Sequence, residues 1–216
     1  GESPRREICL NLEQMGVAVE ASHHEIAPAQ HEIDFQYTDA LCAADNIMTF
    51  KMAAKTIAKR HGLHATFMPK PKEGVNGSGM HINMSLSDML GKNLFVDDTD
   101  ALGLSATAYY FMAGILHHMK PMTILTNPLV KSYKRLIPGY DAPIYIAWSP
   151  TSNRSSLIRI PSPRGGNTRI ELRCPDSAMN PYLALAACLR AGLDGIEKKM
   201  ALPACVEGNM FTMEPE

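Results

Sequence analysis

Residues 22–35 read S-H-H-E-I-A-P-A-Q-H-E-I-D-F, a stretch in which we expect the chain to turn back on itself. The preceding residues 17–20 alternate apolar and polar side chains, as a half-buried strand does. The Pro-containing tetrapeptide 27–30 predicts a turn, after which the chain returns. A strand, a turn and a return segment would bring Glu25 and Glu32 near one point.

Glu25 and Glu32 each follow a histidine and would place two negative charges together. Neighbouring carboxylates repel each other unless a cation or a shared proton offsets the repulsion. A hard divalent ion bound through oxygen is the natural candidate. The other interpretation is an exposed hairpin with two solvated glutamates, and the spacing alone leaves both open.

The composition describes a folded protein without a strongly charged surface. Its 216 residues suffice for one domain, or part of a larger one, with a buried core. A net charge of −1 excludes a global field that would recruit nucleic acid or an acidic membrane. No apolar run reaches membrane-spanning length, and nothing resembles a signal peptide. We therefore expect a cytoplasmic protein, with no nucleic-acid or membrane partner, whose five cysteines are mainly buried free thiols.

The predicted elements follow each other without the regular spacing of βαβ units. Helices are expected at 3–15, 39–60, 101–119 and 181–199, and strands at 17–26, 63–68, 80–87, 144–148, 156–160 and 168–174. Residues 127–142 are expected to be irregular, and Pro121 to end a helix. This order predicts an α+β fold with a largely antiparallel sheet.

A glycine-rich loop at 72–79 leads into the strand predicted at 80–87, whose side chains alternate between two faces. The polar face comprises His81, Asn83 and Ser85, and the apolar face Ile82, Met84 and Leu86. Gly77 and Gly79 permit backbone conformations that bring N–H groups close to a ligand. A neutral His81 imidazole suits a metal ion, although a solvent-facing histidine fits this segment equally well.

The strand predicted at 168–174 carries Arg169, Glu171 and Arg173 on one face. This row is either a surface ion-pair ladder of little energetic value, or the lining of a cleft. In the second case Glu171 would hold a cation and the arginines anionic oxygens. Further arginines at 135, 154 and 159 indicate an anionic small molecule rather than a nucleic-acid surface. The residues alone therefore predict a divalent-metal, phosphate-handling site.

Six segments together resemble type I glutamine synthetase over nearly the whole chain. They read V-E-A-S-H-H-E-I-A-P-A-Q-H-E, N-G-S-G-M-H-I-N-M-S-L, S-Y-K-R-L-I-P-G-Y-D-A-P, N-R-S-S-L-I-R-I-P, T-R-I-E-L-R and N-P-Y-L-A-L-A-A. The resemblance implies the catalytic, C-terminal domain of that family, with a glutamine synthetase/guanido kinase-like fold. Such a fold has a curved, largely antiparallel sheet flanked by helices.

The resemblance also implies an activity: ATP-dependent ligation of ammonia to glutamate through a γ-glutamyl phosphate, giving glutamine, ADP and phosphate. Mg²⁺ or Mn²⁺ ions would organise the phosphates. The full-length protein would be a ring-forming homo-oligomer, a dodecamer in the family. Two alternatives stay open: a related γ-glutamyl–amine ligase acting on polyamines, and a non-enzymatic pseudo-enzyme, which the filled ligand positions disfavour.

Residue roles follow from the same resemblance. Metal ligands would be Glu25 and Glu32 for one ion, and His81 and Glu171 for the other. Nucleotide contacts would be Glu20, Asn83, Ser85, Arg154, Arg159 and Arg169. Glutamate contacts would be Asn76, Gly77, Arg135, Asp141 and Arg173. The catalytic residues would be Asp141, Arg154 and Arg173.

The chain departs from the family pattern at identifiable places. Asp141 stands where the family usually has a glutamate that accepts a proton from ammonium, and a shift of about 1 Å there costs on the order of a hundredfold in rate. Phe211 replaces the tyrosine that some bacterial members adenylylate, so no such modification is expected. We also expect residues 1–216 to be a partial catalytic domain without the family's N-terminal β-grasp domain, its E-x-E strand and its C-terminal helical end. By itself it would bind metal weakly and be inactive.

Overall fold

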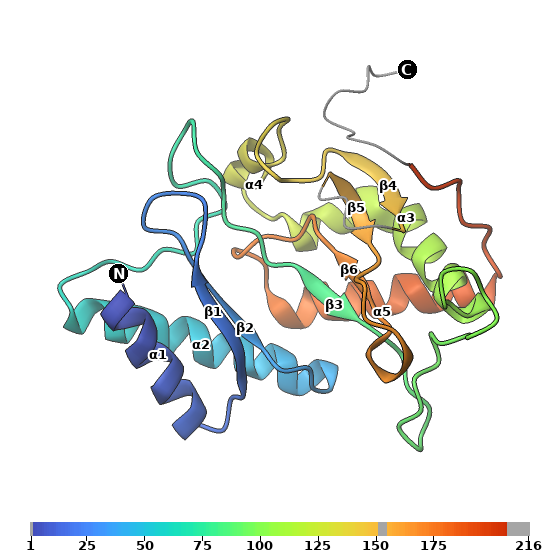
Figure 1. Cartoon of the computed structure of the whole chain (residues 1–216). Helices are drawn as coiled ribbons and strands as arrows, with labels where there is room; N and C mark the ends of the chain where they lie inside the picture. Colours follow the sequence, from blue (N-terminus) through green and yellow to red (C-terminus); the bar gives the residue numbers. More distant parts are fainter. Residues whose placement is uncertain (1, 151–154, 207–216) are drawn as a thin grey trace.

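The computed structural model describes residues 2–150 and 155–206. Its elements form two groups that lie side by side in Figure 1. The first group comprises α1 (Glu2–Gln14), β1 (Val19–His24), β2 (His31–Phe35) and α2 (Ala40–Arg60). The second comprises β3 (Ile82–Met84), α3 (Ala106–Thr126), α4 (Val130–Arg135), β4 (Tyr145–Ser149), β5 (Ser156–Arg159), a 3₁₀ turn (Gly165–Asn167), β6 (Ile170–Leu172) and α5 (Pro181–Glu197).

In the first group, the antiparallel β1–β2 hairpin lies beside the helix pair α1 and α2 (Figure 1). Helix α2 begins as the sequence predicts, because the Asp39 carboxylate accepts hydrogen bonds from the N–H groups of Leu41 and Cys42. A small apolar core joins helices and hairpin. Its buried members are Ile8, Leu12, Val17, Ala53, Ala54 and Ile57.

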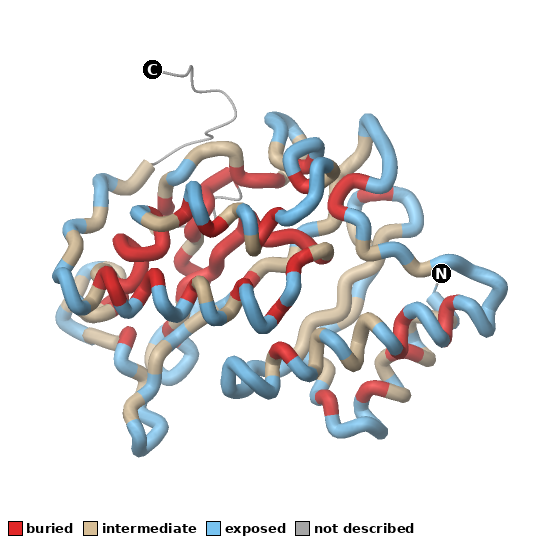
Figure 2. Tube along the Cα trace, turned by 180° about the vertical axis from the view of Figure 1, so that it is seen from behind, coloured by how far each residue is buried: buried red, intermediate tan, exposed pale blue. Residues whose placement is uncertain are grey.

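In the second group, a four-stranded sheet in the order β3-β6-β5-β4 packs against α3 and α5. The β3–β6 and β6–β5 pairs are antiparallel and the β5–β4 pair is parallel, so the predicted α+β fold with a largely antiparallel sheet is confirmed. The two helices cross at Gly114 and Gly195, where a Cβ on Gly114 would lie 2.8 Å from the Gly195 nitrogen. Buried residues concentrate in this group, while the hairpin is mostly intermediate in exposure (Figure 2).

Several predicted boundaries are wrong. Helix α3 begins only after Ser105, whose Oγ accepts a hydrogen bond from the Ala108 N–H, and it continues through Pro121 to Thr126. An internal proline costs about 3 kcal/mol, and burial of Met119 and Met122 on either side of it in the main core offsets that cost.

Two other segments differ from prediction. The strand expected at 63–68 is absent from the described chain, and Leu63 is exposed there. Helix α4 lies within the segment 127–142 that was expected to be irregular. The strand expected at 80–87 is shortened to β3, although its polar and apolar faces keep the predicted alternation of exposure.

Two smaller findings concern the cysteines and membrane spanning. All five cysteines are free, but only Cys174 and Cys188 are buried and Cys42 is exposed, so the expectation of mainly buried thiols is wrong. None of the helices in the described ranges is long and apolar enough to cross a membrane.

Candidate active site

The hairpin brings Glu25 and Glu32 together at a histidine. His23 pairs with Glu32 across β1 and β2, and Glu25 follows two residues later. The Nε2 atom of His23 lies 2.9 Å from Glu25 Oε1 and 3.6 Å from Glu32 Oε2. One potential ligand atom from each of the three residues lies within 4.8 Å of the others. The sequence analysis missed His23, although the spacing H-x-E on a strand puts His23 and Glu25 on one face.

The two carboxyl groups of this cluster have opposite pKa shifts. Burial, with the charges of Asp34 and Glu25, raises the pKa of Glu32 to about 8. Burial acts to raise the pKa of Glu25 too, but hydrogen bonds from Glu32, His23 and the Ile26 N–H outweigh it and leave that pKa lowered. The two pKa values are therefore shifted in opposite directions, with the proton favoured on Glu32 and the charge on Glu25. Two carboxylates and an imidazole held this way form a donor set that a hard divalent cation could occupy in place of the proton.

A second acidic and imidazole pair lies on the four-stranded sheet. His81 Nδ1 is 3.5 Å from Glu171 Oε1, and Arg173 Nη1 is 3.4 Å from the same oxygen. Arg159 pairs with Glu171 across β5 and β6, and its Nε contacts Glu171 Oε2. Glu171 is 4% exposed and Arg173 is 5% exposed. The interpretation of this row as a surface ion-pair ladder is therefore wrong, since two arginines balance a buried carboxylate.

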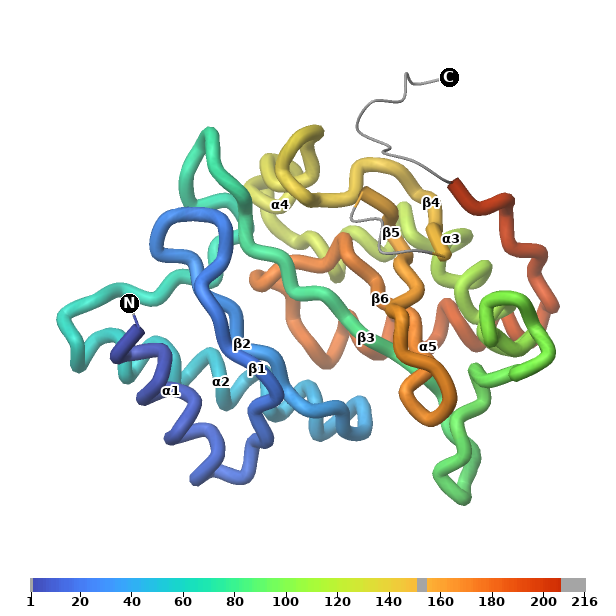
Figure 3. The backbone as a smooth tube through the Cα atoms, in the orientation of Figure 1, coloured from blue at the N-terminus to red at the C-terminus, as the bar shows by residue number. Residues whose placement is uncertain are grey.

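Gln30 joins the hairpin to the glycine-rich loop, and the sequence analysis missed it. Its Nε2 donates to the Gly77 carbonyl over 2.8 Å and to Ser78 Oγ over 3.4 Å. Its Oε1 accepts from the Ala27 N–H over 3.2 Å, which ties the side chain to its own turn. The smooth trace in Figure 3 shows the turn of the hairpin beside this loop. Only the tertiary contact distinguishes Gln30 from an ordinary turn residue.

The glycine-rich loop packs directly against Arg135. A Cβ on Gly77 would lie 2.9 Å from Arg135 Cγ, and one on Gly79 would lie 2.6 Å from Arg135 Nη2 and 3.0 Å from His81 Nε2. Gly77 and Gly79 do not have positive φ values. The sequence predicts that these glycines let backbone N–H groups approach a ligand, and that role stays a prediction. What the structure adds is a steric reason for glycine, because the loop approaches a buried guanidinium closely.

Asp141 contacts two of the other residues predicted to bind glutamate. Its φ of 52° is in the left-handed region, which is uncommon for a residue with a side chain. Asn76 Nδ2 donates to its Oδ2 over 3.4 Å, and Arg173 Nη2 donates to its carbonyl over 3.3 Å. The structure thus brings Asn76, Asp141 and Arg173 together, as the sequence analysis expects.

The residues assigned to the nucleotide are more dispersed. Arg169 Nε donates to Asn83 Oδ1 over 3.1 Å, so these two lie together, and Ser85 is exposed beyond the end of β3. Glu20 is exposed near the start of β1, at the other end of that strand from the acidic cluster. The assignments of Arg154 and Phe211 fall outside the described residues.

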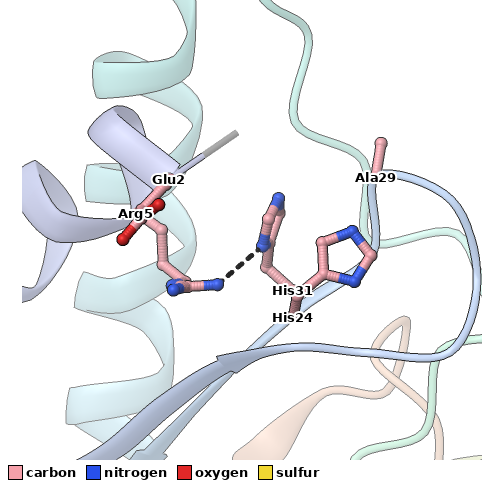
Figure 4. A pocket seen from close by; sticks show the side chains of 5 residues that line it. All are labelled: Glu2, Arg5, His24, Ala29 and His31. Carbon is pink, nitrogen blue, oxygen red and sulfur yellow. Dashed lines mark hydrogen bonds between the residues drawn. The ribbon is translucent and has the colours of Figure 1, made fainter.

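A separate cavity of about 450 Å³ lies beside the hairpin and α1, and Figure 4 shows its side chains. It is lined by Glu2, Arg5, His24, Ala29 and His31. Arg5 Nη1 lies 3.2 Å from His31 Nδ1, and the rings of His24 and His31 meet edge to face. Because neighbouring strand residues face opposite ways, His24 points away from the side that His23 and Glu25 share.

Carboxylate and imidazole clusters beside buried guanidinium groups define a domain equipped to hold cations and anions together, as metal-dependent phosphoryl-transfer enzymes do. A comparison with protein families is more specific. Residues 1–216 match the family described as "Glutamine synthetase, catalytic domain", and the chain belongs to this family. The resemblance stated from the sequence is thereby confirmed.

Curated relatives agree with this family. The chain is 62% identical over 213 residues to a glutamine synthetase of Clostridium saccharobutylicum, covering 99% of this chain and 48% of that protein. It is 60% identical over 217 residues to a glutamine synthetase of Staphylococcus aureus strain MW2, covering 100% of this chain and 48% of that protein. The chain therefore spans about half the length of the curated relatives it matches.

Solved structures share the fold. "Apo GmaS without ligand" aligns with a TM-score of 0.87 and 41% identity, over 99% of this chain and 50% of that chain. "CryoEM Plasmodium falciparum glutamine synthetase" aligns with a TM-score of 0.86 and 38% identity, over 91% of this chain and 38% of that chain. A third structure, "GmaS/ADP complex-Conformation 1", aligns with a TM-score of 0.89.

Proposed function

We propose that this chain carries the catalytic domain of a glutamate–ammonia ligase, which joins ammonia to the γ-carboxylate of glutamate through a γ-glutamyl phosphate. ATP is the phosphoryl donor, and glutamine, ADP and phosphate are the products. The observation that carries this proposal is the continuous contact from the acidic cluster of His23, Glu25 and Glu32, through Gln30, to the loop that lies on Arg135. It joins a candidate cation site to a buried guanidinium.

Divalent metal ions, Mg²⁺ or Mn²⁺, fit the first cluster. Glu25 and Glu32 lie together with the proton favoured on Glu32, and carboxylate oxygens are the ligands that hard cations prefer. His81 and Glu171 offer a second ligand pair. Bound ions would supply charge neutralisation to the phosphates of ATP. The residues of this chain would hold those ions, and Arg159 and Arg173 would hold the Glu171 carboxylate in place through their ion pairs.

The remaining roles concern glutamate and ammonia. Arg135 and Arg173 would hold carboxylate oxygens of glutamate, since a planar guanidinium suits that anion. Asp141 would accept a proton from ammonium, and Asn76 would orient the Asp141 carboxylate through its hydrogen bond to Oδ2. Gly77 would contact glutamate through its backbone, at the place where the loop packs against Arg135. Glu20, Asn83, Ser85, Arg154, Arg159 and Arg169 are proposed nucleotide contacts.

The proposal extends to the rest of the protein. The β-grasp domain and E-x-E strand of the family would complete the site, in a cytoplasmic, ring-forming homo-oligomer. Relatives named glutamine synthetase favour ammonia over a larger amine as the nitrogen donor.

The test uses a full-length enzyme that carries this sequence. Phosphate release from ATP is measured with glutamate and ammonium, and then with putrescine in place of ammonium. We expect release that requires glutamate, ammonium and a divalent ion together, and that Glu32→Ala abolishes. Equal rates with putrescine would overturn the choice of ammonia, and release indifferent to glutamate would overturn the proposal itself.

A further inference from the structure

A buried polar network joins the end of α3 to the segment that follows β6. Thr126, Asn127 and Asp176 are each no more than 1% exposed. Thr126 Oγ1 donates to Asn127 Oδ1 over 2.8 Å, and Asn127 Nδ2 donates to Asp176 Oδ2 over 3.1 Å. The Asp176 N–H donates in return to the Thr126 carbonyl over 3.2 Å. Because these polar groups satisfy each other away from water, the network holds its two segments in one arrangement.

Arg135 is attached to the same segment. Its Nη1 donates to the Cys174 carbonyl over 2.8 Å and to the Pro175 carbonyl over 3.3 Å, and its Nη2 donates to the Arg173 carbonyl over 3.2 Å. These three bonds fix the plane of a guanidinium that is only 3% exposed. The position of Arg135 therefore follows the position of residues 173–175.

Asn127 meets Arg135 at a shared acceptor. Asn127 Nδ2 donates to the Cys174 carbonyl over 2.7 Å, and this is the oxygen that Arg135 Nη1 also contacts. Asp176 adds the opposite charge. Burial lowers the pKa of Arg135 to about 10, and the Asp176 carboxylate opposes that shift. Two buried residues therefore act on Arg135. Asn127 does so through the shared Cys174 carbonyl, and Asp176 does so through its opposite charge.

We infer that Asn127 and Asp176 are positioning residues for Arg135, and that they set the affinity for the carboxylate of glutamate without touching it. The inference rests on the proposed function, in which Arg135 binds glutamate. A Cβ on Gly79 would lie close to both Arg135 Nη2 and His81 Nε2. A displaced Arg135 guanidinium would therefore change its position relative to the proposed ligand pair of His81 and Glu171.

The experiment measures steady-state kinetics of a full-length enzyme carrying Asn127→Ala or Asp176→Asn. We expect the glutamate KM to rise on the order of tenfold, because small displacements of a substrate clamp are costly. The ATP KM and kcat should stay within about twofold. The control is Asp194→Asn, which removes another buried carboxylate, one that bonds His118 and Lys198 at the α3–α5 contact. It should lower Tm but leave the glutamate KM unchanged.

The double variant Asn127→Asp/Asp176→Asn keeps one amide, one carboxylate and the negative charge near Arg135. It should recover part of the glutamate affinity lost in Asp176→Asn, which a general loss of packing would not do. If the single variants lower Tm and kcat while the glutamate KM stays at the wild-type value, the inference is overturned. Absence of glutamine synthesis in the wild-type enzyme would instead overturn the proposed function.

Discussion

Glu25 and Glu32 meet at His23 and have opposite pKa shifts: burial raises the pKa of Glu32 to about 8, so that Glu32 holds a proton at pH 7, whereas the pKa of Glu25 is lowered. A cation that binds both carboxylates must displace this proton. We predict that Mn²⁺ binding to the full-length enzyme at pH 7 releases about one proton from this cluster. Isothermal titration in buffers of different ionisation enthalpy measures the release.

The matched variant is Glu32→Gln, which keeps the shape of the side chain but holds no exchangeable carboxyl proton. It should weaken Mn²⁺ binding and remove the proton release. Wild-type binding with an enthalpy that does not depend on the buffer would contradict the prediction.

Gly79→Ala should impair glutamate binding. The new Cβ would lie 2.6 Å from Arg135 Nη2 and 3.0 Å from His81 Nε2, so the buried guanidinium or the loop must move. We expect the glutamate KM to rise on the order of a hundredfold, following the cost of a misplaced clamp. Gly166→Ala is the control, because its Cβ would meet nothing within 4 Å. Similar kinetics for the two variants would count against the proposed role of Arg135.

Asp141→Asn should lower kcat on the order of a hundredfold, which is the usual contribution of a positioned general base. The amide can still accept the hydrogen bond from Asn76, so the loop should keep its conformation. Initial rates at saturating ammonium measure the loss, and the glutamate KM reports on the loop. A kcat near the wild-type value would exclude Asp141 as the ammonium base.

The contact between α3 and α5 predicts an acid-dependent loss of stability. Hydrogen bonds from His118 and Lys198 lower the pKa of Asp194 below its usual 3.8. A carboxyl group with a lowered folded-state pKa contributes stability that is present above pH 3.8 and is lost as pH falls through the lowered value. Asp194→Asn should reduce that loss, measured as Tm between pH 5 and pH 2.5. An identical decline of Tm in both proteins would contradict this.

Local signals predicted the capped helices and the hairpin well. The Asp39 and Asn180 side chains accept hydrogen bonds from backbone N–H groups at the starts of α2 and α5, a local preference that the residue type reveals. The Pro-containing turn returns the chain toward His31. The extension of α3 past Pro121 escaped prediction, because the burial that offsets the proline comes from distant parts of the chain. Helix α4 was missed because it is short and its N-cap residue is Leu129, whose residue type gives no capping signal.

The candidate site likewise has features that the sequence predicted and features that only the tertiary structure supplied. Residue types and spacing predicted that Glu25 and Glu32 lie near one point, because side-chain chemistry and strand alternation are local properties. The pairing of His81 with Glu171 came from the resemblance to the family, which the sequence motifs carried. The register of the hairpin added His23 against Glu32. Contacts between segments far apart in the chain added Gln30 against Gly77 and the close approach of Gly79 to Arg135. Burial likewise shows that Glu171 and Arg173 of the predicted row lie in the interior, where Arg159 and Arg173 balance the charge of Glu171. The packing of the whole chain decides which groups meet and how far water is excluded from them. The amino-acid sequence by itself already determines the chemistry that each residue offers.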